Sequence, residues 1–311
     1  MTHAVHPAAT ELWRRLVGPD DRVLVIGATG WFGRTTVAML DPATPRMLVA
    51  SRARDFDLLR QTVSVTAWEP DAVRAFEPTV VMDCAFLTRD LVAGMALEDY
   101  VARNTQLTER LLAVSALPSV RRVLTVSSGA AVFPEDALTV PLEQNPYGRL
   151  KREAEVALAE LGERRGIATV IARAWSVSGA FVQKPRSYAL TDMILQALDG
   201  AIHISATVPV FRRYVSVEDL VAVTLAQAEP GRSVLVDSGG PLVEMAELAE
   251  AVAAVVNPGA TITRAEMTDG PANRYHAPAE PWDAACAAAG FTAAGLREQI
   301  AAAAVGVVPS R

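Results

Sequence analysis

The sequence predicts an α/β protein built on a doubly wound, parallel β-sheet, with a smaller, discontinuous C-terminal lobe. Three observations lead to this fold class. Short apolar runs alternate with helical patterns through the first half of the chain, as is typical of parallel strands joined by right-handed crossovers. The first of these runs leads directly into a glycine-rich turn at Gly27–Gly33. The alternation loosens after Ala174, where we expect the second lobe to begin.

The elements of the first domain are expected in regular order. Glu11–Leu16 has the pattern of a short amphipathic helix, and Gly166 is a typical helix C-terminal signal. The helices between the strands are expected to cover both faces of the sheet. Strands are expected at Arg22–Ile26, Arg46–Ala50, Val63–Ala67, Thr79–Asp83, Val120–Val126 and Ala168–Ala172. Helices are expected at Phe32–Leu40, Asp71–Phe76, Leu97–Ser115 and Tyr147–Gly166.

The second half of the chain has a less regular pattern, with strands expected at Tyr214–Val217 and Val234–Asp237. Helices are expected at Leu190–Leu198, Glu218–Ala228, Val243–Val256, Trp282–Ala289 and Ala294–Ala303. We therefore expect residues 1–175 to form a nucleotide-binding domain to which residues 214–240 return. Residues 176–213 and 241–311 are expected to form a substrate-binding lobe.

The composition disfavours several classes of protein. With 311 residues, of which 51% are hydrophobic, the chain can bury a sizeable core. Its net charge of −6 disfavours nucleic acid and anionic membranes as partners, because their general binders are basic. Two cysteines, Cys84 and Cys286, make neither a disulfide framework nor a metal site and predict a reduced, cytoplasmic protein. We expect no signal peptide and no membrane span.

The glycine-rich turn predicts a site for nucleotide phosphates in a Rossmann-type domain. Gly27-x-x-Gly30-x-x-Gly33 follows a strand and opens a helix. Glycines let the backbone approach a pyrophosphate closely, and a helix N-terminus offers free N–H groups to the anion. Ligands of such sheets bind at the carboxyl ends of the strands. The cofactor contacts expected there are Gly27, Thr29, Gly30, Trp31, Phe32, Gly33, Ala85 and Ala174.

The end of the second strand predicts the cofactor. NAD-selective sites place a carboxylate there for the ribose 2′-hydroxyl, whereas an arginine accommodates the 2′-phosphate of NADP. This chain has Ser51 and Arg52 at that position, with Arg54 nearby and no acidic residue. We therefore expect NADP(H) to be preferred, with NAD(H) as the alternative. Arg52 could instead only stack on the adenine.

Tyr147 and Lys151 form a candidate proton-transfer pair. They are four residues apart on one expected helix and so share a face. A free phenol has a pKa of about 10, and a nearby ammonium favours the phenolate and lowers that value toward the working range. The alternative is an ordinary exposed tyrosine and lysine, but the glycine turn and the sheet pattern favour proton transfer.

Polar residues near the end of the fifth strand are further candidates. A hydroxyl of Ser127 or Ser128 can hydrogen-bond a substrate carbonyl beside the tyrosine, although serines are also common in strand-to-loop turns. Asn104 lies within the expected helix that precedes this strand. Because asparagine is unfavourable inside a helix, it indicates a function or is simply tolerated.

The order of these motifs resembles that of the short-chain dehydrogenases/reductases. The Gly27–Gly33 pattern and the chain length look like the extended branch, which contains nucleotide-sugar epimerases, dehydratases and reductases. Arg212–Asp219 is similar to that branch's Arg-x-Phe/Tyr-x-x-Val-x-Asp segment. The resemblance covers roughly residues 22–242. It implies that Arg212 holds the diphosphate of the substrate, with a plain surface arginine as the alternative.

The resemblance also implies roles for the polar residues. Tyr147 would be the general acid–base, Lys151 would tune it and hold the nicotinamide ribose, and Asn104 would support the proton relay. Ser128 would orient the substrate oxygen, with Ser127 as the less favoured choice. The loop after the serines is one residue longer than the nearest family pattern, and counting back from Phe133 without a gap would place Gly129 there instead.

Residues that are missing narrow the reaction. Gly129 and Ala130 stand where the 4,6-dehydratases of the branch carry an Asp-Glu pair. The Cys/His pair of enzymes that combine 3,5-epimerisation with reduction is also missing from this loop, Cys84 lies after the fourth strand and His203 is isolated. The first hypothesis is NADPH-dependent reduction of the keto group of a nucleotide-linked (deoxy)sugar. The alternatives are a nucleotide-sugar 4-epimerase with bound NAD, a reductase of a small non-sugar ketone, and a non-catalytic NADP-binding regulator.

The substrate lobe offers only general candidates. Lys184, Arg186, Tyr188 and Arg213 are polar residues that either contact the substrate or are simply solvated. Family analogy also suggests a homodimer formed through the two long helices of the first domain.

Overall fold

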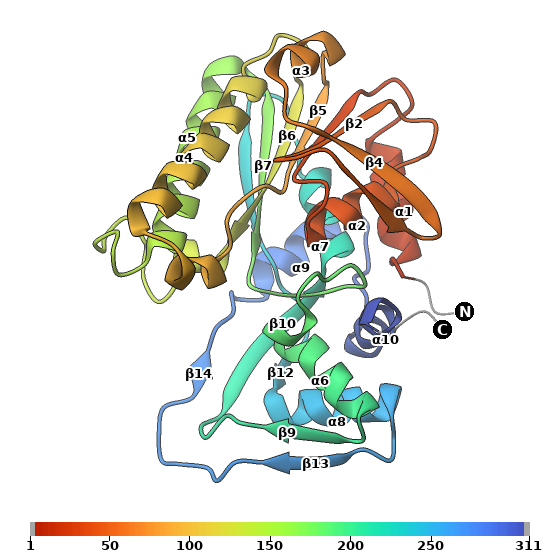
Figure 1. The fold of residues 1–311 in the computed structure, drawn as a ribbon, viewed down its shortest axis with the longest axis vertical. Helices are drawn as coiled ribbons and strands as arrows, with labels where there is room; N and C mark the ends of the chain where they lie inside the picture. The colour runs from red at the N-terminus through yellow and green to blue at the C-terminus, as the bar shows by residue number, and fades with distance from the viewer. Residues whose placement is uncertain (1–3, 308–311) are drawn as a thin grey trace.

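A large, mostly parallel sheet forms the centre of the protein (Figure 1). The computed structural model describes residues 4–307, and within them the sheet has eight strands in the order β11-β7-β6-β5-β1-β2-β4-β3. All neighbours are parallel except β3, which pairs with β4 in the antiparallel direction. The strands are β1 Val23–Ile26, β2 Arg46–Ala50, β3 Arg54–Leu58, β4 Gln61–Ala67, β5 Val80–Asp83, β6 Arg122–Ser128, β7 Ala168–Ala174 and β11 Ser233–Asp237.

Helices cover both faces of this sheet, as the sequence predicts. Successive side chains of a strand point to opposite faces. In β1, Leu24 and Ile26 pack with α3, α4 and α5, while Val23 and Val25 face α1, α2 and α7. The helices are α1 Pro7–Leu16, α2 Trp31–Met39, α3 Pro70–Phe76, α4 Leu97–Ser115, α5 Pro146–Arg165, α7 Val217–Ala226 and α9 Glu280–Ala288.

The hairpin of β3 and β4 was not expected from the sequence. Its turn consists of Leu59 and Arg60, which both have positive φ (50° and 66°), and Leu58 pairs with Gln61 across it. Two such residues form the tight connection that favours Asn-Gly or Asp-Gly. Leu59 and Arg60 do not carry that signal, so the strand before them was missed.

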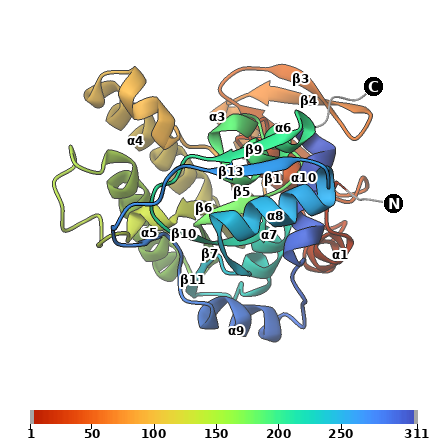
Figure 2. The ribbon, with the colours of Figure 1, turned by 90° about the horizontal axis from the view of Figure 1, so that it is seen from below.

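The second lobe has its own hydrophobic core and lies below the large sheet in Figure 1. Seen from below, the β9–β13 ribbon runs beside α6 and α8 (Figure 2). Ile194, Ile202, Leu248 and Ile300 are fully buried between these elements. The lobe consists of β8 Ser176–Ser178, α6 Ala189–Leu198, β9 Ala201–Ile204, β10 Val210–Ser216, β12 Leu242–Glu244, α8 Met245–Val256, β13 Thr261–Arg264, β14 Asn273–Arg274 and α10 Leu296–Val307.

The return of the chain to the large sheet differs in detail from the prediction. Strand β10 begins earlier than expected and pairs with β8, β12 and β14 rather than with the large sheet. Of residues 214–240, α7 and β11 rejoin the first domain, where β11 pairs with β7. The later helix α9, which was expected in the second lobe, packs there as well. The short strands β8, β9, β12, β13 and β14 were missed because each has only two to four residues, too few for a periodic pattern to be recognised. Three short 3-10 turns complete the fold: η1 Arg89–Gly94, η2 Gly129–Ala131 and η3 Pro185–Ser187.

Among residues 4–307, no helix combines the length and apolar character that a membrane span requires.

Candidate active site

A cavity of about 350 Å³ lies where the first domain meets the second lobe. The first domain contributes the glycine turn, the residues at the ends of β5, β6 and β7, and the first turn and a half of α5. The second lobe contributes the chain from Trp175 to Tyr188. Because this cavity lies at the carboxyl ends of parallel strands, it occupies the position at which open α/β sheets bind their ligands.

The glycine turn forms the cradle that its sequence predicts. Gly27 has φ +78°, and a Cβ on it would lie 2.8 Å from the amide nitrogen of Ala85. A Cβ on Gly33 would lie 2.3 Å from the carbonyl oxygen of Gly27. Gly30 is the N-cap of α2. The backbone therefore closes tightly here and leaves the free N–H groups of the helix for an anion, which fits the pyrophosphate of a dinucleotide.

A second cavity of about 260 Å³ continues from the glycine turn along the end of β2. Gly27, Thr29, Ser51 and Ala85, four of the predicted cofactor contacts, line it. Trp68 and Arg110 also line it. Sequence reasoning missed this pair because the two residues come from different elements, β4's end and α4.

Three arginines gather at the rim beyond Ser51. Arg52 and Arg54 are exposed, and neither lines this cavity. The Arg34 guanidinium lies 4.1 Å from the ring centre of Phe56 on β3. Burial and then the nearby charge of Arg54 lower the pKa of Arg34. In the described part of the chain, none of the three forms an ion pair with a carboxylate, so this corner has unbalanced positive charge.

The start of α5 positions Tyr147 beside the loop that follows β6. Asn145 caps the helix by accepting a hydrogen bond from the Gly148 N–H at 3.0 Å. Its side-chain amide also donates to the Ala130 carbonyl at 3.0 Å. A Cβ on Gly148 would lie 2.1 Å from that same carbonyl oxygen, so only glycine permits this approach. The helix and the loop are thereby joined at the point where Tyr147 and Ser128 meet.

Tyr147 faces Ser128, and both line the cavity. Burial raises the pKa of Tyr147 above its ordinary value, and the nearby Ser128 side chain partly opposes this. The direction is opposite to the one that the sequence predicts, because Lys151 does not act as the dominant neighbour of the phenol. Tyr147 is therefore a protonated phenol at neutral pH and can donate a proton.

Lys151 is buried one turn further along α5. Its Nζ donates to the Val126 carbonyl at 2.6 Å and lies 3.8 Å from the ring centre of Phe86. Phe86 in turn packs edge-on against the Tyr147 ring at 5.9 Å. Burial lowers the pKa of Lys151 to about 8, and Asp83 and Glu155 oppose this. Phe86 and Asp83 were not predicted as site residues.

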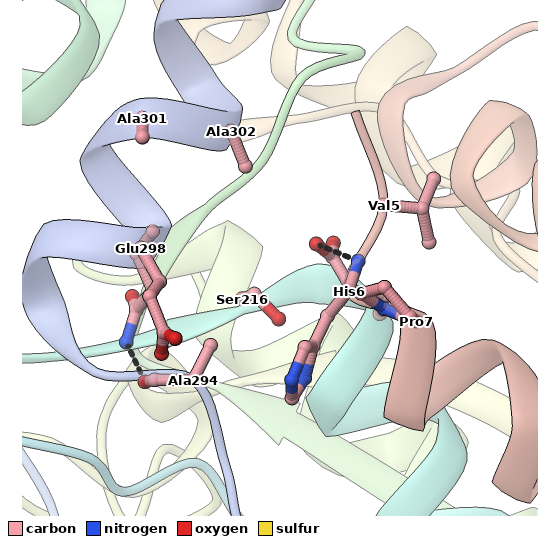
Figure 3. A pocket seen from close by; sticks show the side chains of 10 residues that line it. Val5, His6, Pro7, Ser216, Ala294, Glu298, Ala301 and Ala302 are labelled. Atoms are coloured by element: carbon pink, nitrogen blue, oxygen red, sulfur yellow. Dashed lines mark hydrogen bonds between the residues drawn. The ribbon is translucent and has the colours of Figure 1, made fainter. Parts of the chain in front are cut away.

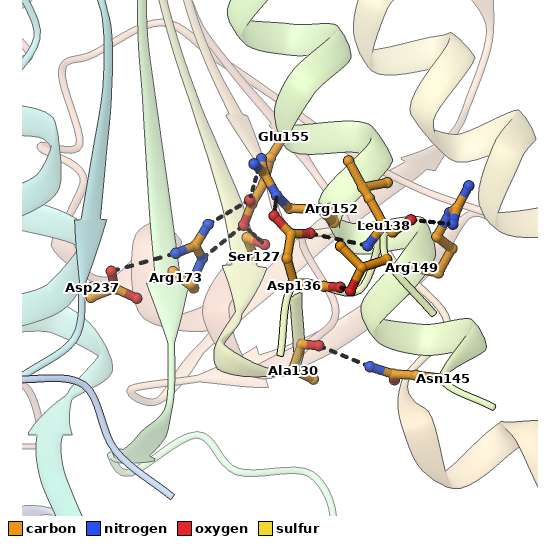
Figure 4. A network of polar contacts seen from close by, with 11 residues as sticks. Ser127, Ala130, Asp136, Leu138, Asn145, Arg149, Arg152, Glu155, Arg173 and Asp237 are labelled. Atoms are coloured by element: carbon orange, nitrogen blue, oxygen red, sulfur yellow. Dashed lines mark hydrogen bonds and ion pairs between the residues drawn. The ribbon is translucent and has the colours of Figure 1, made fainter. Parts of the chain in front are cut away.

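Ser127 and Ser128 have different surroundings although both line the cavity. The Ser127 hydroxyl donates to Glu155 at 2.5 Å. Glu155 also accepts two hydrogen bonds from Arg173, at 2.6 and 3.0 Å, and Arg173 reaches Asp237 on β11 (Figure 4). Ser127 is therefore part of a buried polar network that joins α5 to β7 and β11. The Ser128 hydroxyl instead accepts from the Ala130 N–H at 3.2 Å.

Gly129, the third candidate for the position beside the tyrosine, has no side chain to offer. A Cβ there would lie 2.4 Å from the indole of Trp175. The glycine thus serves the close packing of the loop on Trp175.

Asn104 lies on α4, is fully buried, and contacts the loop after β5. Its Oδ1 accepts from the Leu87 N–H at 2.8 Å, and the Tyr100 hydroxyl donates to the Leu87 carbonyl at 2.7 Å. Its Nδ2 has no hydrogen-bond partner among the described residues. Asn104 therefore holds the segment that carries Phe86, and the structure does not place its side chain among those that line the cavity.

An aromatic cluster lies beside the cavity, and its member Trp175 lines it. Tyr275, just after β14, lies 4.9 Å from Trp175 and 5.3 Å from Phe133 between ring centres. Burial raises the pKa of the Tyr275 phenol, and the nearby Ser128 side chain is the first influence that opposes this rise. Tyr147 and Tyr275 thus flank Ser128. Sequence reasoning missed Tyr275 because it follows a two-residue strand in a stretch with no regular pattern.

Of the predicted substrate residues, Arg212 contacts this cluster, but neither Arg212 nor Arg213 lines the cavity. The Arg212 guanidinium is 5.6 Å from the ring centre of Tyr275, and it donates to the side chain of Asn273 at 2.9 Å. Arg213 donates to the Gly240 carbonyl at 3.0 Å. Lys184 and Tyr188 line the cavity, whereas Arg186 points to Asp192 at 3.1 Å and does not. Trp31 packs edge-on against Tyr188 at 5.0 Å and so connects the glycine turn with the second lobe.

Another cavity, of about 250 Å³, lies near the N-terminus and shares no lining residue with the first (Figure 3). Its lining includes His6, Ser216 and Glu298. His6 contacts Asp219 at 2.7 Å and thereby ties the N-terminal segment to α7. The predicted site residues are all elsewhere.

The glycine cradle, the adjoining cavities and the Tyr147–Lys151 pair define an NAD(P)-dependent enzyme of the short-chain dehydrogenase/reductase type. The sequence model of the NAD dependent epimerase/dehydratase family matches residues 23–236, and the chain belongs to this family.

Individual relatives agree with this assignment. The dTDP-4-keto-6-deoxy-D-glucose reductase of Streptomyces niveus is 32% identical over 161 residues, which are 50% of this chain and 52% of that protein. The match thus spans about half of that relative. UDP-glucose 4-epimerase from Thermotoga maritima, solved with UDP-glucose, has a TM-score of 0.72 and 18% identity over 92% of this chain and 98% of its own. UDP-glucose 4-epimerase from Brucella ovis, solved with NAD, has a TM-score of 0.70 and 18% identity, with coverage of 92% and 98%.

Proposed function

We propose that this enzyme reduces the keto group of a nucleotide-linked (deoxy)sugar, with NADPH as the reductant. One observation carries the proposal. The cavity is lined by Tyr147, Ser128 and Lys151, and its lining within residues 4–307 includes no aspartate, glutamate or histidine. A phenol and a hydroxyl can serve a carbonyl oxygen, but abstraction of a proton from a sugar carbon usually needs a carboxylate or an imidazole as base. Reduction at a carbonyl carbon is therefore favoured over dehydration.

The residues of the cavity divide the chemical work. A bound nicotinamide dinucleotide supplies the hydride that adds to the carbonyl carbon. Tyr147, protonated because burial raises its pKa, donates its proton to the carbonyl oxygen, which becomes the hydroxyl of the product. Ser128 holds that oxygen in line with the phenol. Lys151 keeps a positive charge near the phenolate that remains, and this charge favours the proton transfer.

The cofactor is assigned from the cradle and from the charges at its rim. Gly27, Gly30 and Gly33 would hold the pyrophosphate on the N-terminus of α2. Ser51 would contact the adenosine ribose, and Arg52, with Arg34 and Arg54 close by, would neutralise a 2′-phosphate. The support for NADPH is that these arginines form no ion pair with a carboxylate in the described structure, so an anionic ligand would balance them.

The substrate is assigned from the curated relative and from the second lobe. The S. niveus protein that is similar to half of this chain is named as a reductase of a dTDP-linked 4-keto-6-deoxysugar. Trp175 and Tyr275 offer aromatic faces beside Ser128, and Arg212 offers a guanidinium near the rim. This combination suits a ligand with a ring and a diphosphate.

A 4-epimerase is the second candidate, because structural neighbours named as UDP-glucose 4-epimerases share the fold. The same tyrosine would then remove a proton from a sugar hydroxyl and return one later. The two functions differ in the cofactor, since an epimerase regenerates the nicotinamide dinucleotide that it holds.

Cofactor titration separates the two functions. The purified protein is titrated with NADPH and with NADH while nicotinamide fluorescence is followed, and the released cofactor is identified after denaturation. Exchangeable binding with a clear preference for NADPH supports the reductase. Retained NAD without a preference for NADPH would overturn it in favour of the epimerase.

A further inference from the structure

We propose that Asp83 is a positioning residue that keeps Lys151 protonated and so maintains the charge beside Tyr147. The proposal deepens the proposed function and rests on it for the role of Tyr147. It concerns a carboxylate that lies behind the cavity and not on its wall, and that neither the glycine turn nor the Tyr-x-x-x-Lys motif includes.

Hydrogen bonds from neighbouring groups hold the Asp83 carboxylate in place at the end of β5. Asp83 is the last residue of β5 and is 8% exposed. The Thr125 hydroxyl on the neighbouring strand donates to its Oδ2 at 2.9 Å, and the Ala85 N–H donates to its Oδ1 at 3.3 Å. Both oxygens are thus held, and the carboxylate cannot turn away from α5 without losing a partner.

Asp83 and Lys151 face each other across a small cavity of about 10 Å³, which Thr125, Ser127 and Glu155 also line. This is about the space that one water molecule needs. Within residues 4–307, the Lys151 ammonium has one hydrogen bond, to the Val126 carbonyl, and the ring of Phe86 lies on another side. A buried ammonium in such a place needs a counter-charge.

Glu155 cannot be that counter-charge on its own. It accepts from Ser127 and is paired with Arg173 at 2.6 Å and with Arg152 at 3.4 Å. Both carboxylate oxygens of Glu155 are therefore already engaged by guanidiniums, although Arg152 also pairs with Asp136 and Arg173 with Asp237. In contrast, no arginine of residues 4–307 forms an ion pair with Asp83. Cys84, the other titratable neighbour, is neutral because burial raises the pKa of its thiol.

The two groups are not in direct ion-pair contact, but each influences the other's protonation as a nearby opposite charge does. Burial raises the pKa of Asp83 to about 6, and Lys151 is the first influence that opposes this rise. Burial lowers the pKa of Lys151 to about 8, and Asp83 is the first influence that opposes this fall. Between these values both groups are charged. Without Asp83, the Lys151 ammonium would be buried with no free counter-charge and would lose its proton at a lower pH.

The composition of the chain makes this testable without a substrate. Lysine occurs only twice in the sequence, as Lys151 and Lys184. Protein labelled with ¹³C at the lysine ε-carbon gives two signals, which a Lys184→Arg variant assigns. Lys184 is exposed and serves as an internal reference. The signals are followed from pH 5 to pH 11 in the full-length protein, in wild type, in Asp83→Asn, and in Asp55→Asn as a control with an exposed aspartate.

The expected result is a midpoint for Lys151 that lies below that of Lys184 and falls further in Asp83→Asn, by about one pH unit or more. The Lys184 midpoint and the Asp55→Asn protein should stay at wild-type values. A Lys151 midpoint that is unchanged in Asp83→Asn would overturn the proposal. If that variant does not fold, the wild-type Lys151 signal alone decides, because it should show a second inflection as Asp83 titrates, and a single inflection would contradict the pairing.

The pH dependence of kcat provides a second test of the proposal. With a reductase substrate, Asp83→Asn should lower kcat more at pH 8 than at pH 6, because Lys151 has then lost more of its charge. The NMR result does not depend on the reaction, so a failure of the proposed function and a failure of this inference can be told apart.

Discussion

Tyr147 lies at the meeting point of α5, the loop after β6 and the segment that carries Phe86. Asn145 and Gly148 bring the helix close to the Ala130 carbonyl, so the phenol is placed by backbone contacts. The Asn-Pro-Tyr-Gly sequence predicts a helix start but not this contact with a loop fifteen residues earlier. The sequence thus pointed to Tyr147 and Lys151 as a pair, but it did not show which groups orient Tyr147.

Replacing Tyr147 by phenylalanine tests the proton donor. The ring contacts with Phe86 would be kept, while the proton for the substrate oxygen would be lost. We expect kcat to fall by about 10²–10⁴ and the Kd for NADPH to stay near that of wild type. Steady-state kinetics and fluorescence titration measure the two quantities. Retained turnover would remove Tyr147 from this role.

Single alanine substitutions of Ser127 and Ser128 should have different consequences. Ser128→Ala removes the hydroxyl beside Tyr147 and should lower kcat with little change in stability. Ser127→Ala removes a hydrogen bond to the buried Glu155 carboxylate and should cost about 1.5–3 kcal/mol of unfolding free energy with a smaller effect on kcat. Urea unfolding and kinetics of both variants distinguish the two. Reversed effects would contradict the assignment of Ser128 to the substrate.

At the scale of elements, the parallel sheet and its helices were predictable because apolar runs mark the strands and glycines mark the turns and helix ends. Apart from β3, the order of strands and helices through β7 agrees with the sequence, and α4 agrees to the residue. The β3–β4 hairpin was not predictable, since Leu59 and Arg60 adopt positive φ without the usual turn residues. This hairpin places Arg54 and Phe56 beside Arg34, and so it completes the cluster of positive charge formed by Arg34, Arg52 and Arg54.

Arg52→Asp tests this corner. A carboxylate there would repel a 2′-phosphate and accept a hydrogen bond from a 2′-hydroxyl. We expect the ratio of the NADPH to the NADH dissociation constant to rise by about tenfold or more. Arg46→Asp, at the other end of β2, is the matched control and should leave the ratio unchanged. An unchanged ratio in Arg52→Asp would contradict the cofactor assignment.

At the scale of the whole molecule, the site is completed by a lobe that folds around its own core. Its short strands carry little pattern, and β14 is only two residues long. The sequence therefore predicted that a second lobe exists but not that its Tyr275 reaches Ser128. The homodimer through α4 and α5 and the cytoplasmic location stay predictions.

Tyr275→Phe tests whether the second lobe takes part in the reaction. The phenylalanine would keep the packing on Trp175 and Phe133 and lose only the hydroxyl. We expect kcat/KM to fall by about tenfold, the equivalent of roughly one neutral hydrogen bond, with an unchanged melting temperature. Tyr275→Ala should lower both quantities. Wild-type kinetics in Tyr275→Phe would limit the residue to a structural role.

Transfer of the hydride itself tests the account most directly. The protein is incubated with dTDP-4-keto-6-deoxy-D-glucose and with NADPH that carries deuterium at C4 of the nicotinamide, on each face in turn, and the sugar product is analysed by mass spectrometry and NMR. The account predicts that one of the two labelled cofactors places a deuterium on the former carbonyl carbon, and that Tyr147→Phe prevents this. A sugar that receives no deuterium from either labelled cofactor would contradict it.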